Sequence, residues 1–368
     1  MNQVGHSERA EITLCYGTRP QVIKASVLRR ALGRRWRVQA VDTGQHYDYA
    51  LNRLLYEQLQ VRPPDVFLEV GSGTHAEQTA SILTRAEALL KDSGPRVVVV
   101  IGDTNSTLGA ALAAVKLRIP VVHVEAGLRA RDDLMAEEIN RRVVDAVSTV
   151  LCAPSQSAAE QLRRERPGSQ VFVTGDVARD VLLASEPRLP ATGAVLPPGI
   201  TGRYLLATLH RAELTEHLTL LRQVLRALGE LPIPTVLPMH PRTKAALKSD
   251  SLGGEFGALR VVGPVGYLES VALIRGAAGV LTDSGGVQRE AYWLGVPCVT
   301  LRRETEWGET VLLGANRLLE PGRVPLELPG VVHSLLEGVP GVWNRDAYGN
   351  GDAADRVADA VTALTGRP

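Results

Sequence analysis

Two acidic residues that follow short apolar runs are the feature of this sequence best suited to do chemistry. Asp103 comes just after the run VVVVI, and Glu125 comes directly after VVHV. Continuous apolar runs of this length are typical of buried parallel strands, whose carboxyl ends meet at one edge of a sheet. Two carboxylates on adjacent strand ends can act on one substrate as acid and base. Taken alone, Asp103 is explained at least as well by a helix cap, and Glu125 shifts that balance toward catalysis.

A further pair of carboxylates, Glu137 and Glu138, begins a predicted helix within AEEINRR. Carboxylates in the first turn of a helix are often no more than favourable partners of its dipole. The other reading is that one of the two side chains points toward a substrate, and the sequence leaves both readings open.

A third group of residues is suited to hold an anion. Within GTRPQVIK, Gly17 permits a tight turn after a strand, and Arg19 and Lys24 bring two cations to the start of a helix. The positive end of a helix dipole and its unpaired amides favour an anion at this place. A solvated loop arginine is the alternative explanation of Arg19. Because no GxGxxG follows a strand, a dinucleotide-binding fold has little support.

The second half of the chain offers a stronger anion site. In TDSGGVQREA, Ser284, Gly285 and Gly286 open a helix after a strand, so bare backbone amides can surround a diphosphate. Glu290 lies further along the same helix and could accept hydrogen bonds from ribose hydroxyls. A glycine-rich turn without a ligand is the plainer alternative. His210 and Arg211 follow another strand in TLHRAE, a setting that suits phosphate binding.

The elements that must position these residues alternate between strand and helix. Short β-rich runs are predicted as strands at residues 12–16, 37–42, 97–101, 121–124, 149–153, 171–174, 204–209, 235–238, 259–262, 279–282 and 298–301. Helical patterns lie between these runs, which predicts βαβ units with right-handed crossovers and parallel sheets. In open sheets of this kind, ligands bind at the carboxyl ends of the strands, where most of the candidate residues lie.

The length of 368 residues favours two domains. Proline and glycine break the alternation between Glu186 and Gly202, which predicts a linker there. We expect an N-terminal domain over residues 1–185, a C-terminal domain over 203–350 and a substrate cleft between them. The last segment, 351–368, is predicted to be largely an amphipathic helix, which could pack back on the N-terminal domain.

Composition excludes several function classes. The 41 basic and 40 acidic residues give a net charge of +1, which argues against a nucleic-acid partner. No apolar stretch is long enough to span a bilayer, and the polar start does not resemble a signal peptide, so no membrane partner is expected. The three cysteines have no metal-ligand spacing and lie in apolar runs, which predicts buried reduced thiols, no metal and a cytoplasmic protein.

Taken together, these motifs resemble the non-hydrolysing UDP-N-acetylglucosamine 2-epimerases. The resemblance rests on GTRPQVIK, TGQHYD, GDTNSTL, HVEAGLR, EEINR, TLHRAE, HPRTK, PVGYLES and TDSGGVQREA, which occur in this order from about Ile12 to Asn316. It implies an α/β fold of the GT-B type, in which two Rossmann-like doubly wound domains border a cleft. It also implies a UDP-sugar substrate, no cofactor and a homodimer.

The resemblance also implies roles for individual residues. The catalytic residues would be Asp103, Glu125, Glu137 and His210, with His210 beside the β-phosphate. The substrate-binding residues would be Arg19, Lys24, Gln45, His46, Arg129, Arg211, His240, Tyr267, Ser284, Gly285, Gly286 and Glu290, with Tyr267 near the uracil.

The reaction implied is the elimination of UDP across C1 and C2 of the sugar, followed by its return to the resulting glycal. Such a path needs cations and hydrogen-bond donors for the departing diphosphate and carboxylates on both faces of the ring. No metal is needed. These requirements match the residue types found at the predicted strand ends.

Three departures from the family pattern keep the substrate and its regulation open. The segment ETEWGET (304–310) resembles the branch that includes epimerases of UDP-2,3-diacetamido-glucuronic acid, for which Arg131, Arg302 or Arg303 could bind the carboxylate of the sugar. Ala136 replaces the usual proline before the paired glutamates. Glu77 stands where some bacterial members, which their substrate activates, have an arginine, so such activation stays open here.

Three rival functions remain at this point. A GT-B glycosyltransferase would share the UDP site but need an acceptor. A hydrolysing epimerase would release the free sugar and UDP. A non-catalytic sensor would bind the UDP-sugar without turning it over.

Overall fold

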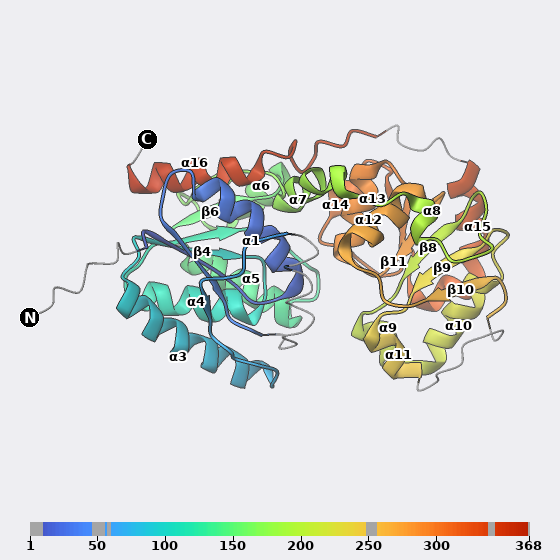
Figure 1. Cartoon of the computed structure of the whole chain (residues 1–368), viewed down its shortest axis with the longest axis horizontal. Coiled ribbons are helices and arrows are strands. Elements are labelled where there is room, and N and C mark those ends of the chain that lie inside the picture. Colours follow the sequence, from blue (N-terminus) through green and yellow to red (C-terminus); the bar gives the residue numbers. More distant parts are fainter. Residues whose placement is uncertain (1–9, 46–55, 57–59, 248–255, 338–342, 367–368) are drawn as a thin grey trace, which may run out of the picture. The chain divides into compact units, whose positions relative to one another are not determined.

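The computed structural model describes residues 10–45, 56, 60–247, 256–337 and 343–366 (Figure 1). Its contacts divide the chain into two compact units. The first unit comprises the described residues of Met1–Ala184 and Asp346–Pro368, and the second comprises those of Ser185–Arg345.

The first unit is built on a parallel sheet of seven strands in the order β3-β2-β1-β4-β5-β6-β7. The strands are β1 (Ile12–Tyr16), β2 (Val38–Asp42), β3 (Val66–Phe67), β4 (Val97–Ile101), β5 (Val121–Val124), β6 (Val150–Ala153) and β7 (Gln170–Val173). The helices are α1 (Arg19–Leu32), α3 (His75–Ser93), α4 (Asn105–Lys116), α5 (Ala136–Val147), α6 (Gln156–Glu165), α7 (Val177–Ser185) and α16 (Ala353–Thr365). Helices α3, α4 and α5 cover one face of the sheet, and α1 and α16 pack together on the other (Figure 1).

The second unit repeats this arrangement with a parallel sheet of six strands in the order β10-β9-β8-β11-β12-β13. The strands are β8 (Leu205–Thr208), β9 (Thr235–Pro238), β10 (Leu259–Val262), β11 (Gly279–Thr282), β12 (Cys298–Thr300) and β13 (Asn316–Leu318). The helices are η1 (Glu186–Arg188), α8 (Thr192–Val195), α9 (Ala212–Thr215), α10 (Leu218–Gly229), α11 (Pro241–Leu247), α12 (Tyr267–Gly276), α13 (Gly285–Leu294), α14 (Gly308–Leu312), η2 (Pro321–Arg323) and α15 (Val324–Glu337).

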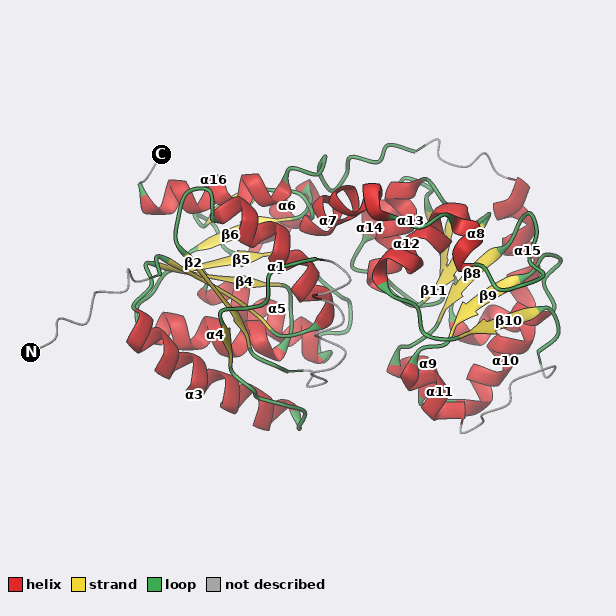
Figure 2. Cartoon of the chain, in the orientation of Figure 1, coloured by secondary structure: helices red, strands yellow, loops and turns green. Residues whose placement is uncertain are grey.

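Apolar layers on both faces of each sheet explain why the strands read as continuous apolar runs. In the second unit, Leu205 and Leu281 pack toward α10 and α15, whereas their neighbours Leu206 and Val280 pack toward α12 and α13 (Figure 2). Every second residue of a strand faces one layer, so a strand covered on both faces needs apolar residues at every position.

The predicted strands are all present, and the structure adds β3 and β13. Both additional strands lie at the edge of their sheets and are only two and three residues long. The three cysteines are buried and unpaired, and burial raises the pKa of each thiol to about 12. No helix in the described part of the chain is long and apolar enough to cross a membrane.

The segment predicted as a linker, Glu186–Gly202, is not a bare connection. It forms η1 and α8, and the hydroxyl of Thr192 donates to the carbonyl of Ala272 at 3.1 Å. Ile200 is buried in the core beside α12. The composition of the segment concealed this packing because its few apolar residues follow no regular period.

Candidate functional site

The strand order of each unit fixes where its candidate residues meet. In each sheet the first strands of the unit are added toward one edge, and the later strands are added toward the other edge. The strand order therefore reverses between β1 and β4 in the first unit and between β8 and β11 in the second. Loops leave the sheet in opposite directions at such a point and open a crevice at the carboxyl ends of the strands. The loops that begin at Gly17, Gly102, Leu209 and Asp283 all leave their sheets at these points.

In the first unit, the turn after β1 requires a glycine. A Cβ atom at Gly17 would lie 2.0 Å from Oγ1 of Thr43 and 2.1 Å from Oγ of Ser106. The amide of Gly17 donates to Oε1 of Gln21 at 2.9 Å, and Nε2 of Gln21 donates to the carbonyl of Ile101 at 2.6 Å. Gln21 therefore fastens the start of α1 to the end of β4, and Arg19 lies exposed at this start.

Glu125 and Lys24 form a buried ion pair beside that turn. The Nζ atom of Lys24 lies 2.6 Å from Oε1 of Glu125, and the two side chains are only 10% and 7% exposed. The backbone of Glu125 has a φ of 69°, in the left-handed region that non-glycine residues rarely adopt. Strain of this kind persists only where the surrounding structure enforces it, and it is concentrated at functional sites.

Asp103 follows β4 and is held by a residue that the sequence reasoning did not single out. Nη2 of Arg141 lies 2.5 Å from Oδ2 of Asp103, and Nδ2 of Asn140 donates to the backbone carbonyl of Asp103 at 2.9 Å. Asn140 and Arg141 both belong to the EEINR motif, three and four residues after Glu137, and so lie on one side of α5. Their spacing from Glu137 is the sequence signal that indicates both residues.

The structure distinguishes the two glutamates at the start of α5. Glu138 is fully buried and accepts hydrogen bonds from the amide of Ala130 at 2.9 Å, from Arg141 at 3.1 Å and from Arg142 at 2.9 Å. Glu137 is exposed in the first turn of the helix. Of the pair, Glu137 is therefore the one accessible to a substrate.

Two residues predicted to bind substrate in the first unit have extensive contacts within the protein. Oε1 of Gln45 accepts from the amide and the hydroxyl of Ser106, at 3.0 and 2.7 Å. Arg129 contacts Asp145 at 2.8 Å and Glu165 at 2.5 Å. These contacts give both side chains a structural role, whatever else they bind. His46 lies outside the described residues.

In the second unit, a buried aspartate connects the two loops at the strand-order reversal. Oδ2 of Asp283 accepts from the amides of His210 and Arg211, at 2.8 Å each, and Oδ1 lies 3.4 Å from Nδ1 of His210. Burial lowers the pKa of His210; the charge of Asp283 opposes this shift, and the charges of Arg211 and Arg242 add to it. The ring of His210 lies 5.0 Å from that of the exposed His240.

Helix α13 presents its first turn at the same edge. Ser284 is the N-cap of this helix, and its hydroxyl oxygen accepts from the amide of Val287 at 3.4 Å. Gly285 and Gly286, which lie between these two residues, supply the first amides of the helix. A Cβ atom on Gly285 would approach Nε1 of Trp307 to 3.2 Å. Glu290 is half-buried two turns or less from the N-cap. The first amides of a helix have no carbonyl partner within it, so this turn can bind an anion.

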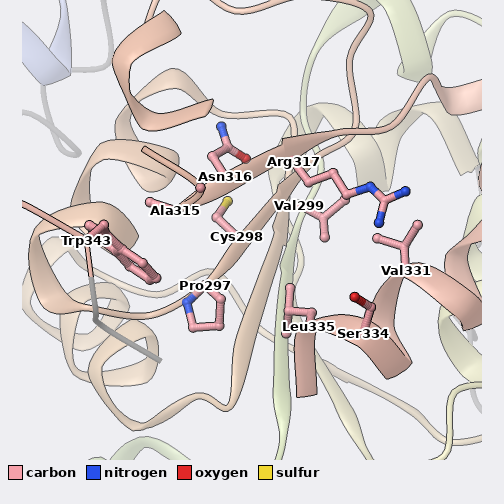
Figure 3. A pocket seen from close by; sticks show the side chains of 11 residues that line it. Pro297, Cys298, Val299, Ala315, Asn316, Arg317, Val331, Ser334, Leu335 and Trp343 are labelled. Atoms are coloured by element: carbon pink, nitrogen blue, oxygen red, sulfur yellow. The ribbon is translucent and has the colours of Figure 1, made fainter. Parts of the chain in front are cut away.

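Tyr267, the remaining predicted residue, begins α12 and is half-buried. A separate cavity of the second unit lies at the amino ends of β12 and β13, where Cys298, Asn316 and Trp343 contribute to its lining (Figure 3). None of the described residues predicted to bind substrate lines this cavity. Among the described residues, no group of three or more His, Cys, Asp or Glu side chains could hold a metal ion.

Comparison with known proteins gives one consistent result. The sequence model of the family described as UDP-N-acetylglucosamine 2-epimerase matches residues 30–362. The UDP-2,3-diacetamido-2,3-dideoxy-D-glucuronate 2-epimerase of Pseudomonas aeruginosa is 40% identical, over 96% of this chain and 100% of that protein. The UDP-N-acetylglucosamine 2-epimerase of Methanocaldococcus jannaschii is 37% identical, over 96% of this chain and 99% of that protein.

Solved structures agree with the sequence comparisons. The crystal structure of the M. jannaschii UDP-GlcNAc 2-epimerase in complex with UDP-GlcNAc and UDP matches with a TM-score of 0.85 at 37% identity, over 96% of this chain and 99% of that chain. The calicheamicin glycosyltransferase CalG4 matches with a TM-score of 0.57 at 16% identity, over 98% and 99%. The second likeness concerns the fold alone, which is the GT-B fold expected from the sequence.

Proposed function

Because the chain belongs to the UDP-N-acetylglucosamine 2-epimerase family, we propose that it interconverts UDP-N-acetylglucosamine and UDP-N-acetylmannosamine. The observation that carries the proposal is the placement of Asp103 and Glu125 at the ends of the neighbouring strands β4 and β5, each ion-paired with a cation. Ionised carboxylates at such a place can remove and return a proton. A glycosyltransferase or a binding protein would not require them.

The first unit is assigned the proton transfers of the reaction. Asp103, which is paired with Arg141, removes the proton from C2. The electron pair of the C2–H bond forms the C1=C2 double bond, and the C1–O bond breaks with its electrons going to UDP. Glu125 and Glu137 are the groups assigned to the other face of C2, where a returned proton gives the epimer as UDP adds back to C1. Asp103 gives its proton up to solvent, and the donor on the other face takes its proton from solvent, so atoms and charge balance without an oxidant. UDP leaves C1 and adds back to it within each cycle.

The second unit is assigned the UDP group. The first turn of α13 binds the diphosphate, and Glu290 accepts hydrogen bonds from the ribose. Nδ1 of His210 faces a carboxylate oxygen of Asp283, so a proton on Nδ1 leaves Nε2 able to take up another. A diphosphate near the imidazole would favour this uptake, after which Nε2 donates to the charge that develops on the leaving group.

A second candidate substrate is UDP-2,3-diacetamido-glucuronic acid, which the name of the Pseudomonas relative favours. Its C6 carboxylate would need a cation. Arg302 is 3% exposed in its side chain and pairs with Glu306 at 3.0 Å, and Arg303 pairs with Glu320. Arg131 is exposed in the loop before α5, whereas Arg302 is buried, so solvent access favours Arg131 over Arg302 for this contact.

The test is to incubate the purified protein with UDP-N-acetylglucosamine in D₂O, without metal or NAD, and to follow the products by NMR. We expect UDP-N-acetylmannosamine carrying deuterium at C2, and loss of at least 100-fold in rate for Asp103→Asn. Free N-acetylmannosamine and UDP would indicate a hydrolysing enzyme instead. If the protein does not react with UDP-N-acetylglucosamine but does turn over the diacetamido uronate, the second candidate is the substrate of the same reaction.

We also propose that the protein acts as a cytoplasmic homodimer, which rests on the cysteine usage and on the family resemblance. Light scattering coupled to size-exclusion chromatography measures the mass directly. A mass equal to that of one chain, 39.6 kDa, would reject the dimer.

A further inference from the structure

A buried histidine lies beneath the two candidate carboxylates of the first unit. His123 is the third residue of β5, two positions before Glu125, and its side chain is 0% exposed. Its Nδ1 atom lies 2.7 Å from Oδ1 of Asp145 on α5, and its Nε2 atom lies 2.8 Å from the carbonyl oxygen of Gly102. Gly102 immediately precedes Asp103. Both ring nitrogens therefore contact groups that support the site.

The partners of His123 determine how many protons its ring carries. The carbonyl of Gly102 can only accept, so Nε2 must donate. Oδ2 of Asp145 accepts from the amide of Gly127 at 3.2 Å and lies 2.8 Å from Nη1 of Arg129. This amide and this guanidinium favour the ionised form of the Asp145 carboxylate independently of the His123 ring. Asp145 is thus ionised and also accepts from the ring.

A neutral imidazole has one N–H group and cannot donate to both partners. Donation to both partners at once requires the imidazolium form of the ring, with Asp145 as its counter-charge. The charged groups around it are Asp145 from α5 and Arg129 from the loop after β5, and the Glu125 carboxylate lies close by. A Cβ atom on Gly102 would lie 3.4 Å from Oε2 of Glu125, so the imidazolium binds the backbone directly beside that carboxylate.

The same two side chains fasten both turns that carry the carboxylates. His123 holds Gly102, whose φ is 68°, and Asp145 holds Gly127, whose φ is 85°. Glu125, whose backbone is strained, lies in the sequence between His123 and Gly127. Without the imidazolium, the Gly102 carbonyl and the Asp145 carboxylate would each lose a buried partner, and both turns would be free to relax.

We propose that His123 is a permanently protonated positioning residue, whose two N–H groups hold Asp103 and Glu125 in the geometry and charge state that proton transfer requires. The role of His123 in the reaction rests on the proposed function. The protonation of its ring is independent of that function and can be measured without any substrate.

The direct test is NMR of the ¹⁵N-histidine-labelled protein at pH 8.5, where freely titrating histidines are neutral. Among the eight histidines, we expect one ring with protons on both nitrogens. Its signals should disappear in His123→Gln and persist in His333→Gln, a change at an exposed residue of α15 whose side chain is 73% exposed. A spectrum of the parent protein in which every histidine ring carries a single proton would overturn the proposal. This outcome is decisive even if His123→Gln does not fold.

The role in catalysis is tested by the kinetics of His123→Gln, because a glutamine amide can replace one of the two hydrogen bonds but not the charge. We expect kcat to fall about 100-fold with KM within a few-fold of the parent. The acidic limb of the pH profile should move to higher pH, since removing a buried positive charge raises the pKa of a neighbouring carboxylate. UDP affinity, measured by calorimetry, should be unchanged. An unshifted profile with the parent's kcat would reject the positioning role, and His333→Gln should match the parent throughout.

If neither UDP-sugar is turned over by the parent protein, the proposed function fails while the NMR result still decides the protonation of His123.

Discussion

At the residue scale, the candidate carboxylates depend on cations that come from distant parts of the sequence. Lys24 on α1 reaches Glu125 after β5, and Arg141 on α5 reaches Asp103 after β4. A buried carboxylate without a partner would shift toward its neutral form because burial disfavours charge. Lys24 and Arg141 therefore each place a positive charge beside one of these carboxylates.

The pair of Lys24 and Glu125 gives the first prediction at this scale. Lys24→Met should lower the free energy of unfolding by about 3 kcal/mol, because it removes the cation that pairs with the buried carboxylate of Glu125. Urea denaturation measures this loss. The double variant Lys24→Met/Glu125→Gln should recover most of the stability but none of the activity. Equal instability of the single and double variants would contradict the explanation.

At the scale of elements, side-chain hydrogen bonds fasten the starts of helices to other elements of the first unit. Gln21 fastens the start of α1 to β4. Asp180 on α7 accepts from the amides of Ala353 at 3.2 Å and Ala354 at 2.8 Å, and so holds the start of α16. Burial raises the pKa of Asp180 to about 6; hydrogen bonds from those two amides oppose the shift, and the charge of Asp176 adds to it.

The raised pKa of Asp180 predicts a pH dependence of stability with a definite sign. The folded state holds this proton more tightly than the unfolded state, where the pKa is near its ordinary value of 3.8. The stabilising contribution is complete below that value and is lost as the pH rises through about 6. The difference in unfolding free energy between the parent and Asp180→Asn should therefore decrease from pH 4 to pH 6.5. A difference that is constant or that increases over this range would contradict the prediction.

At the scale of the whole molecule, the chain leaves the first unit after Ala184, forms the second unit and returns at Asp346. The returning segment ends in α16, which packs on α1 and β6 and buries Val357, Ala360 and Val361 completely. The first unit therefore has no complete core until the last residues of the chain have been added.

Removal of residues 346–368 should consequently destabilise the first unit and leave the second intact. Hydrogen exchange should accelerate in peptides of β1, β4 and α1, while UDP binding is retained. A variant lacking only residues 367–368 serves as the matched control and should behave as the full chain does. Unchanged exchange in β1 and α1, or lost UDP binding, would refute this division of the molecule.

The sequence by itself determined the strands, the parallel sheets and the residue types at their ends. This was feasible because a strand buried on both faces must be apolar throughout, and Val97–Ile101 and Val121–Val124 lie where they were predicted. Edge strands escaped prediction because Val66–Phe67 and Asn316–Leu318 are too short to show a pattern.

Only the tertiary structure decided which partners those residues meet. Glu137 and Glu138 are equivalent in the sequence, yet one is exposed and the other fully buried in an ion-pair network. Arg141, Asp283 and the two acceptors of His123 likewise became apparent from contacts across the sheet. Local sequence patterns report which face of an element is apolar, whereas a buried polar group is stable only with a partner that the packing of distant segments supplies.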